Sequence, residues 1–117
     1  MKWIACLDLE SVLLPELWPA LGQALKIDDL HLTTRDVADK VALNARRLQA
    51  LKKARVSVQQ IEAVMNTLRP LPGAAGFLRW LGPRLPFVIV SDCFAQMAAP
   101  LLPALGFPTL VAHSWRT

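Results

Sequence analysis

The sequence predicts an α/β fold: an open, parallel sheet of about three strands, into which a purely helical segment is inserted. Three short, mostly apolar runs, at residues 3–7, 87–90 and 109–112, have the length and the charge-free character of strands buried on both faces. A helical stretch separates the last two runs, which implies a right-handed parallel crossover. With 117 residues and 54% hydrophobic content, the chain is long enough for one small core and is not a disordered protein.

The first strand and the helix after it have clear boundaries. Residues 3–7 are apolar and stop abruptly at Asp8, as expected where a buried strand emerges at the edge of a sheet. Pro15 and the following glutamate open a helix that runs to about residue 25. Pro19 is tolerated in this helix because it falls near the first turn, where a backbone N–H group has no helical partner.

Two further helices are predicted from their capping residues. Asp39 can cap a helix running to about residue 54, because a carboxylate accepts hydrogen bonds from the first free N–H groups. Ser57 and Gln60 form a capping box for a third helix, which ends near residue 68, before Pro70. The apolar side of the first of these two helices is expected to carry Val41, Leu43, Leu48 and Leu51.

The C-terminal part alternates helix and strand. Residues 73–81 read as a helix closed by Gly82, and the strand at 87–90 ends in a Ser–Asp pair. A proline-interrupted helix then runs to about residue 105, with Gly106 as its C-terminal cap. The expected organisation is therefore a partial α/β core formed by residues 1–14 and 72–117, with residues 15–71 as an inserted helical cap.

The charge distribution argues against a dedicated nucleic-acid binder. The formal net charge is +4, but the excess of basic residues lies mostly between Arg35 and Arg55, without interleaved aromatic residues. All nine Asp and Glu residues lie at or before Asp92, so an acid-free C-terminal stretch also contributes to the positive net charge. A nucleic-acid function is kept as the least favoured hypothesis, which a steep salt dependence of binding would revive.

The two cysteines and the hydropathy pattern indicate a cytoplasmic, soluble protein. Cys6 and Cys93 have no CxxC spacing, and no secretory signal precedes them, so we expect two buried thiols in a reducing compartment. The uncharged run at residues 93–112 is divided by prolines and a glycine, which fits a helix, a turn and a strand better than a membrane span.

Two of the predicted strands end in residues suited to phosphoryl transfer. In open parallel sheets ligands bind beyond the carboxyl ends of the strands, and here those ends carry Asp8 and Ser91. Glu10 follows Asp8 on the same emerging loop. A carboxylate nucleophile, a proton donor for the leaving group and a hydroxyl for the phosphate form a chemically complete set.

The motifs resemble those of the haloacid dehalogenase-like phosphatases, which have a Rossmann-like parallel sheet. Residues 8–13, Asp-Leu-Glu-Ser-Val-Leu, resemble the first motif of these enzymes, and residues 91–92 resemble the second. The usual first motif has Asp at its second acidic position, where this chain has Glu10. That glutamate, together with residues 71–74 and 105–110, most resembles the bacterial phosphoserine phosphatases that also act as homoserine phosphotransferases.

The resemblance covers residues 3–113 and implies roles for individual residues. Asp8 would be the nucleophile that forms an aspartyl-phosphate and would also bind Mg²⁺, with the backbone carbonyl of Glu10 as a second ligand. The Glu10 side chain would protonate the leaving hydroxyl and later activate water. Ser91 would hydrogen-bond the phosphoryl oxygens, helped by backbone N–H groups of the turn at Asp92.

The resemblance also implies a phosphoserine subsite in the cap. Glu16 would receive the ammonium group of the substrate, and Arg47 its carboxylate. Simpler roles remain open: Glu16 favours a helix N-terminus, Arg47 can extend from an apolar stripe to solvent, and Ser91 can be a helix N-cap. Asp8, Glu10 and Asp92 can be ordinary turn, loop or capping acids. Cys93 and His113 are assigned no functional role.

The later motifs of the resembled family, a lysine and an acidic loop, have no counterpart after Asp92. We therefore expect a phosphatase-like hydrolase that is incomplete by itself, with weakly held Mg²⁺. The alternative is an inactive module that associates with a full-length relative. Because a sheet of about three strands leaves edges and apolar surface uncovered, we also expect homo-oligomers or association through the sheet edge.

Overall fold

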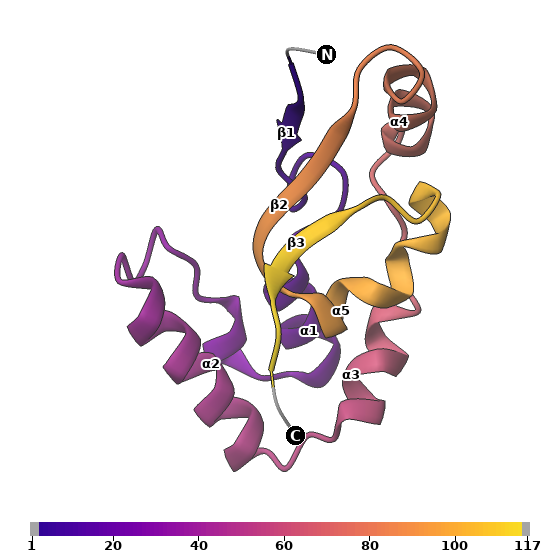
Figure 1. Cartoon of the computed structure of the whole chain (residues 1–117). Coiled ribbons are helices and arrows are strands. Elements are labelled where there is room, and N and C mark those ends of the chain that lie inside the picture. The colour runs from indigo at the N-terminus through magenta and orange to yellow at the C-terminus, as the bar shows by residue number, and fades with distance from the viewer. Residues whose placement is uncertain (1–2, 116–117) are drawn as a thin grey trace. The chain divides into compact units, whose positions relative to one another are not determined.

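The computed structural model describes residues 3–115, and these residues form a three-stranded parallel sheet (Figure 1). β1 spans Ala5–Leu7, β2 spans Phe87–Phe94 and β3 spans Leu110–His113. The strand order is β1-β2-β3, so β2 is central and the other two strands are edges. The predicted α/β fold with a parallel sheet of about three strands is confirmed.

β2 is longer than predicted and irregular at its carboxyl end. Val90 lies opposite Val111 of β3, and the next pair joins Phe94 to His113. Between these two pairs β2 advances by four residues and β3 by two. The extra residues form a bulge-like segment, residues 91–93, between the two pairs. Irregularities of this kind bend a strand and redirect its side chains, and they are frequent beside active sites.

Five α-helices and three short 3₁₀ turns connect and flank the strands within the described residues. The helices are α1 Leu17–Leu25, α2 Lys40–Lys53, α3 Val58–Met65, α4 Ala74–Leu81 and α5 Ala95–Ala98. The 3₁₀ turns are Asp28–His31, Ala99–Leu101 and Pro103–Leu105. The predicted proline-interrupted helix to about residue 105 is instead the short α5 followed by two 3₁₀ turns, because Pro100 and Pro103 lack the N–H groups that an α-helix needs. Gly106 ends this region with a φ of 81°, which confirms its predicted capping role.

The predicted helix caps are confirmed. Oδ1 of Asp39 accepts hydrogen bonds from the N–H groups of Val41 at 2.9 Å and Ala42 at 3.4 Å. At α3 the N–H of Gln60 donates to the Ser57 hydroxyl oxygen at 3.1 Å, and the N–H of Ser57 donates to Oε1 of Gln60 at 2.7 Å. These bonds satisfy N–H groups that each helix start leaves without helical partners.

The prediction of the apolar side of α2 was correct for two of its four residues. Leu43 and Leu51 are buried as predicted, whereas Val41 and Leu48 are exposed. At about 100° per residue, these two side chains lie roughly 140–160° around the helix from Leu43. They therefore belong to the solvent side of α2, and the buried stripe is completed by Ala50 instead.

The first strand is also less buried than its apolar sequence predicts. Trp3 and Ile4 are exposed and precede β1, and Cys6 is exposed, which corrects the prediction of two buried thiols. Successive side chains of a strand point to opposite faces, and the half-buried Ala5 and Leu7 point away from Cys6. One face of this edge strand is covered and the other is open.

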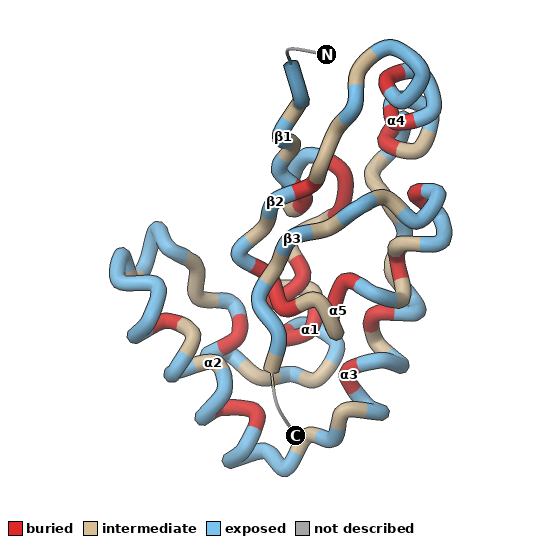
Figure 2. The backbone as a smooth tube through the Cα atoms, in the orientation of Figure 1, coloured by how far each residue is buried: buried red, intermediate tan, exposed pale blue. Residues whose placement is uncertain are grey.

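The chain divides into two compact units. The first contains the described residues up to Leu17 and those from Met65 onward, and the second is Trp18–Val64. Each has its own buried apolar residues, whose backbone is red in Figure 2. The first unit buries, among others, Leu9, Leu13, Leu14, Ile89 and Met97; the second buries, among others, Trp18, Leu21, Leu30, Leu43 and Leu51. The division into a core of residues 1–14 and 72–117 with a cap of residues 15–71 stays a prediction.

The described helices are all too short or too polar to cross a membrane.

Candidate active site

Asp8 follows β1 directly and begins a tight turn. Its Oδ1 accepts a hydrogen bond from the N–H of Leu9 at 2.8 Å. The carbonyl of Leu9 in turn accepts from the N–H groups of Leu13 at 2.8 Å and Leu14 at 3.0 Å. These three leucines are buried, whereas Asp8 is exposed. The turn is thus anchored by apolar side chains, and it presents the Asp8 carboxylate at the surface.

Glu10 and Glu16 belong to the same turn region. Glu10 is half-buried, and its Oε1 atom is shielded from solvent. Ser11 has a φ of 67°, and its hydroxyl donates a hydrogen bond to Oε1 of Glu16 at 3.3 Å. Ser11 therefore joins the Asp8 turn to the residue that precedes α1. This role of Ser11 was not predicted. The signal for it in the sequence is a small polar residue between Glu10 and Glu16.

Ser91 and Asp92 lie in the irregular part of β2. The hydroxyl oxygen of Ser91 accepts a hydrogen bond from the N–H of Cys93 at 3.1 Å, and Asp92 is exposed. The residue before α5 is Phe94, so the alternative of Ser91 as a helix N-cap is wrong. The side chain instead closes a small turn within the strand, of the kind that serine hydroxyls commonly form.

Strand register brings the two motifs to one edge of the sheet. Leu7 lies opposite Ile89 in the parallel β1–β2 pair, so Asp8 and Ser91 follow these positions by one and two residues. Neighbouring strands are about 4.8 Å apart, so the backbone positions of Asp8 and Ser91 lie near each other at this edge of the sheet. The expectation that the two motifs belong to adjacent parallel strands agrees with this register, whereas the expectation that the second strand ends at Ser91 was wrong.

The pKa of Cys93 gives a second link between the motifs. Burial raises the pKa of this thiol, and the negative charges of Glu10 and Asp92 raise it further. The Ser91 hydrogen bond acts in the opposite direction. An effect of Glu10 on a group in β2 requires the carboxylate to lie near residues 91–93. The segment that follows β1 and the bulge of β2 therefore share one electrostatic environment.

Arg47 belongs to the second unit and is held by three residues of it. Its NH1 donates to Oδ1 of Asn44 at 3.1 Å, and its NH2 donates to the carbonyl of Leu32 at 3.2 Å. The guanidinium carbon lies 5.2 Å from the ring centroid of Trp18, within cation–π range. Asn44 and Trp18 were not predicted as partners. The i−3 spacing of Asn44 was a weak signal, and nothing in the sequence pointed to Trp18.

The oxygen donors at the candidate site fit Mg²⁺ in part. Residues 3–115 contain no group of three or more His, Cys, Asp or Glu side chains arranged for a metal ion. Asp8 offers one exposed carboxylate beside the backbone carbonyls of its turn, whereas Mg²⁺ requires six oxygen ligands in near-octahedral geometry. The described residues would leave most of the coordination shell to water.

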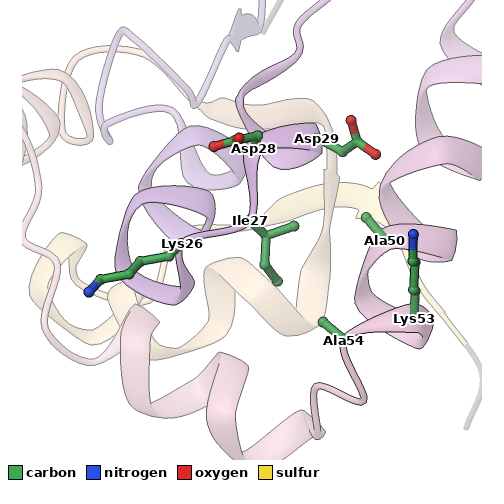
Figure 3. Close-up of a pocket in the computed structure, with 7 residues that line it drawn as sticks. All are labelled: Lys26, Ile27, Asp28, Asp29, Ala50, Lys53 and Ala54. Carbon is green, nitrogen blue, oxygen red and sulfur yellow. The ribbon is translucent and has the colours of Figure 1, made fainter.

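A separate hollow of about 440 Å³ lies in the second unit (Figure 3). Ile27 and Ala50 supply apolar walls, and Lys53 and Asp29 lie at its rim. Asp29 also pairs with Arg46 at 3.5 Å, with both side chains about half exposed. None of the predicted site residues lines this hollow, so it has no part in the candidate active site.

No family model matches the chain, but curated relatives do. A phosphoserine phosphatase of Pseudomonas syringae pv. tomato is 46% identical over 110 residues, which are 94% of this chain and 46% of that protein. Phosphoserine phosphatase ThrH of Pseudomonas aeruginosa is 46% identical over 110 residues, which are 94% of this chain and 54% of that protein.

The chain is therefore homologous to phosphoserine phosphatases, which confirms the resemblance inferred from the motifs. It spans about half the length of the curated relatives it matches.

Proposed function

We propose that this chain carries the nucleophile and phosphate-binding residues of a phosphoserine phosphatase-like hydrolase. The observation that carries the proposal is the arrangement of Asp8, which directly follows β1, and Ser91, which lies in the irregular part of the adjacent parallel strand β2. Homology to phosphoserine phosphatases supports the substrate class. A small phosphorylated amino acid is the expected substrate, and a cytoplasmic location stays part of the proposal.

The proposed reaction has two displacements at phosphorus. An oxygen of the Asp8 carboxylate attacks the phosphorus atom, the bond to the serine oxygen breaks, and Glu10 gives its proton to that oxygen. Glu10 then takes a proton from water, whose oxygen attacks phosphorus and breaks the bond to Asp8. Phosphate leaves, and both carboxyl groups return to their starting states. The shielded position of Oε1 suits a group that must hold and return a proton at one place.

The segment around Ser91 would bind the phosphoryl group. The hydrogen bond from Cys93 uses one acceptor position of the Ser91 hydroxyl, and a hydroxyl also has one O–H donor. That donor can be directed at a phosphoryl oxygen, together with the backbone N–H of Asp92. Bound Mg²⁺ would neutralise charge on the phosphoryl group, with the Asp8 carboxylate and the Glu10 carbonyl as its protein ligands.

Glu16 and Arg47 are proposed to recognise the amino-acid part of the substrate. Glu16 lies in the same turn region as Asp8, linked to it through Ser11, and its carboxylate would receive the ammonium group. Arg47 would receive the carboxylate, and Asn44 and Trp18 would hold its guanidinium in place. Arg47→Ala should then weaken the binding of phosphoserine and leave the binding of inorganic phosphate nearly unchanged, as titration calorimetry can measure. Equal losses for both ligands would refute this role.

A second candidate function is an inactive module that associates with a longer relative or with itself. The observation in its favour is the uncovered edge at β1, beside which the large apolar side chains of Trp3 and Ile4 are exposed. Natural edge strands usually carry charges, prolines or bulges that prevent pairing, and residues 3–7 contain neither charge nor proline. Copurification with a full-length phosphoserine phosphatase would support this function.

The test of the first candidate is phosphate release from phosphoserine by the pure chain with Mg²⁺. We expect a rate at least about a thousandfold below that of the Pseudomonas aeruginosa relative. The lysine and the acidic loop of the resembled family have no counterpart among these residues, and each group of that kind contributes roughly 10²-fold or more. Asp8→Asn should abolish whatever rate remains. A residual rate that survives Asp8→Asn would refute Asp8 as the nucleophile, and a rate equal to that of the relative would refute the expected low activity of these 117 residues.

A further inference from the structure

The outward side of α4 carries an unusual set of residues. Ala74, Leu78 and Leu81 form its buried stripe. Outside this stripe α4 exposes Phe77 and Trp80, with 42% and 54% of their surfaces accessible to solvent. Amphipathic helices at the surface of a protein normally place polar residues there. In Figure 2 this helix shows buried and exposed positions alternating around its axis, as expected for a helix with one covered side.

The exposed residues form one ordered surface. The rings of Phe77 and Trp80 are stacked, with centroids 6.2 Å apart and planes inclined by 24°. The guanidinium carbon of Arg84 lies 4.6 Å from the Trp80 ring centroid, and Arg84 also donates a hydrogen bond to the Trp80 carbonyl. We call Phe77, Trp80 and Arg84 the α4 patch; Arg79 lies about 160° around the helix from Phe77 and is outside it. Because its rings and Arg84 are already held in place, binding there would cost little side-chain entropy.

The charge around the α4 patch has one sign. Between Glu62 and Asp92 the sequence has three arginines, one in the patch and one elsewhere on α4, and neither a lysine nor a carboxylate. Tryptophan and arginine are the residues most enriched among those that dominate the affinity of protein interfaces. An arginine-flanked aromatic surface is therefore complementary to a segment that combines carboxylates with an apolar side chain.

We propose that the α4 patch docks a short acidic protein segment. The apolar side chain of the segment lies on the Phe77 and Trp80 rings, and its carboxylates pair with Arg84. A second copy fits less well, because a symmetric contact would bring the same arginines together. A nucleic-acid strand also fits less well, because the two rings already stack on each other. None of the proposed active-site residues belongs to the patch, so this inference stands apart from the proposed function.

The test is a fluorescence anisotropy titration of the whole chain with two labelled 12-residue peptides. One alternates glutamate with leucine, and the other alternates lysine with leucine. We expect the acidic peptide to bind at least about tenfold more tightly at low salt, with a difference that shrinks as salt screens the charges. Trp80→Ala should weaken this binding by at least about tenfold, and Arg84→Gln should weaken it and reduce its salt dependence.

Trp3→Ala is the matched control, because Trp3 is a more exposed tryptophan (78%) in the same unit but far from α4 in sequence. This variant should bind the acidic peptide as the original chain does, and circular dichroism should show all variants folded. Equal affinity for both peptides, or equal loss in the Trp3 and Trp80 variants, would overturn the proposal. Concentration-dependent self-association, or binding of oligothymidylate or anionic vesicles, that needs Trp80 while the acidic peptide does not bind would also overturn it.

Discussion

Replacement of Arg47 should destabilise the second unit far more than replacement of its neighbour Arg46. Both arginines lie in α2, one residue apart, so a change to alanine has the same effect on helix propensity at each site. Their environments differ. Arg47 is half-buried and held by Asn44, Leu32 and Trp18, whereas Arg46 is about half exposed and pairs with a similarly exposed aspartate at 3.5 Å.

The difference can be estimated from these interactions. Hydrogen bonds from a charged donor contribute about 1.5 kcal/mol each at the lower end of their range, and a partly exposed cation–π pair contributes about 0.5–1 kcal/mol. Because the guanidinium is partly hydrated, we discount the total for Arg47→Ala to about 2–3 kcal/mol. An exposed ion pair is worth about 0–0.5 kcal/mol, so Arg46→Ala should change the free energy of unfolding very little.

Urea denaturation followed by circular dichroism at 222 nm measures both changes, because the signal reports the helices of this unit. Arg47→Lys is a useful third variant, since a lysine keeps the charge but cannot donate in the same fork-like geometry. It should recover less than half of the lost stability. A loss below about 0.5 kcal/mol for Arg47→Ala, or equal losses for the two alanine variants, would refute the structural role described for Arg47.

The other predictions concern burial. Leu9→Ala should lower the free energy of unfolding by about 2–4 kcal/mol, because Leu9 is fully buried in the Asp8 turn. Leu48 is exposed, so Leu48→Ala should change the free energy of unfolding by less than about 0.5 kcal/mol. Equal effects of the two variants in urea denaturation would contradict this packing. Cys6 should react rapidly with a thiol reagent at pH 8 and Cys93 slowly, so Cys6→Ser should remove the fast phase. Burial raises the pKa of Cys93 above the ordinary value of 9.0, so the thiol of the unfolded chain ionises first as pH rises. The free energy of unfolding should therefore fall above pH 9.0, and it should fall less in the Cys93→Ser variant.

Local signals in the sequence predicted the helix ends well. The Asp39 cap, the Ser57–Gln60 capping box and the left-handed Gly106 all depend on neighbouring residues in the chain, and each occurs as predicted. The prolines at 100 and 103 were recognised, but their combined effect was underestimated. Two prolines three residues apart leave no uninterrupted turn of α-helix between them, so 3₁₀ turns form instead.

Features that depend on distant residues were predicted less well. The apolar run at residues 3–7 shows that a strand is favourable but not which of its faces another element covers, and Cys6 is on the open face. β2 continues past Ser91 and Asp92 because it pairs with β3 again at Phe94. A polar pair after an apolar run predicted the end of the strand, and the later pairing has no local signal.

The candidate site shows the same division. Asp8, Glu10 and Ser91 were predicted because strand ends at one edge of a parallel sheet collect polar residues, and the register agrees with that reasoning. The Ser11 bond to Glu16 and the partners of Arg47 could not be predicted, because they depend on turn geometry and on side chains from separate elements. Arg47 was assigned through the family resemblance and not from any local signal of its contacts.

The most direct test of the proposed chemistry is a chimera in which this chain replaces the matched 110 residues of phosphoserine phosphatase ThrH from Pseudomonas aeruginosa. If Asp8 is the nucleophile and Ser91 binds the phosphoryl group, the folded chimera should hydrolyse phosphoserine. Asp8→Asn should lower kcat by at least about a thousandfold, and Ser91→Ala should lower it by about 10–100-fold. A folded chimera without activity, or one that keeps its activity after Asp8→Asn, would contradict the assignment of Asp8 as the nucleophile.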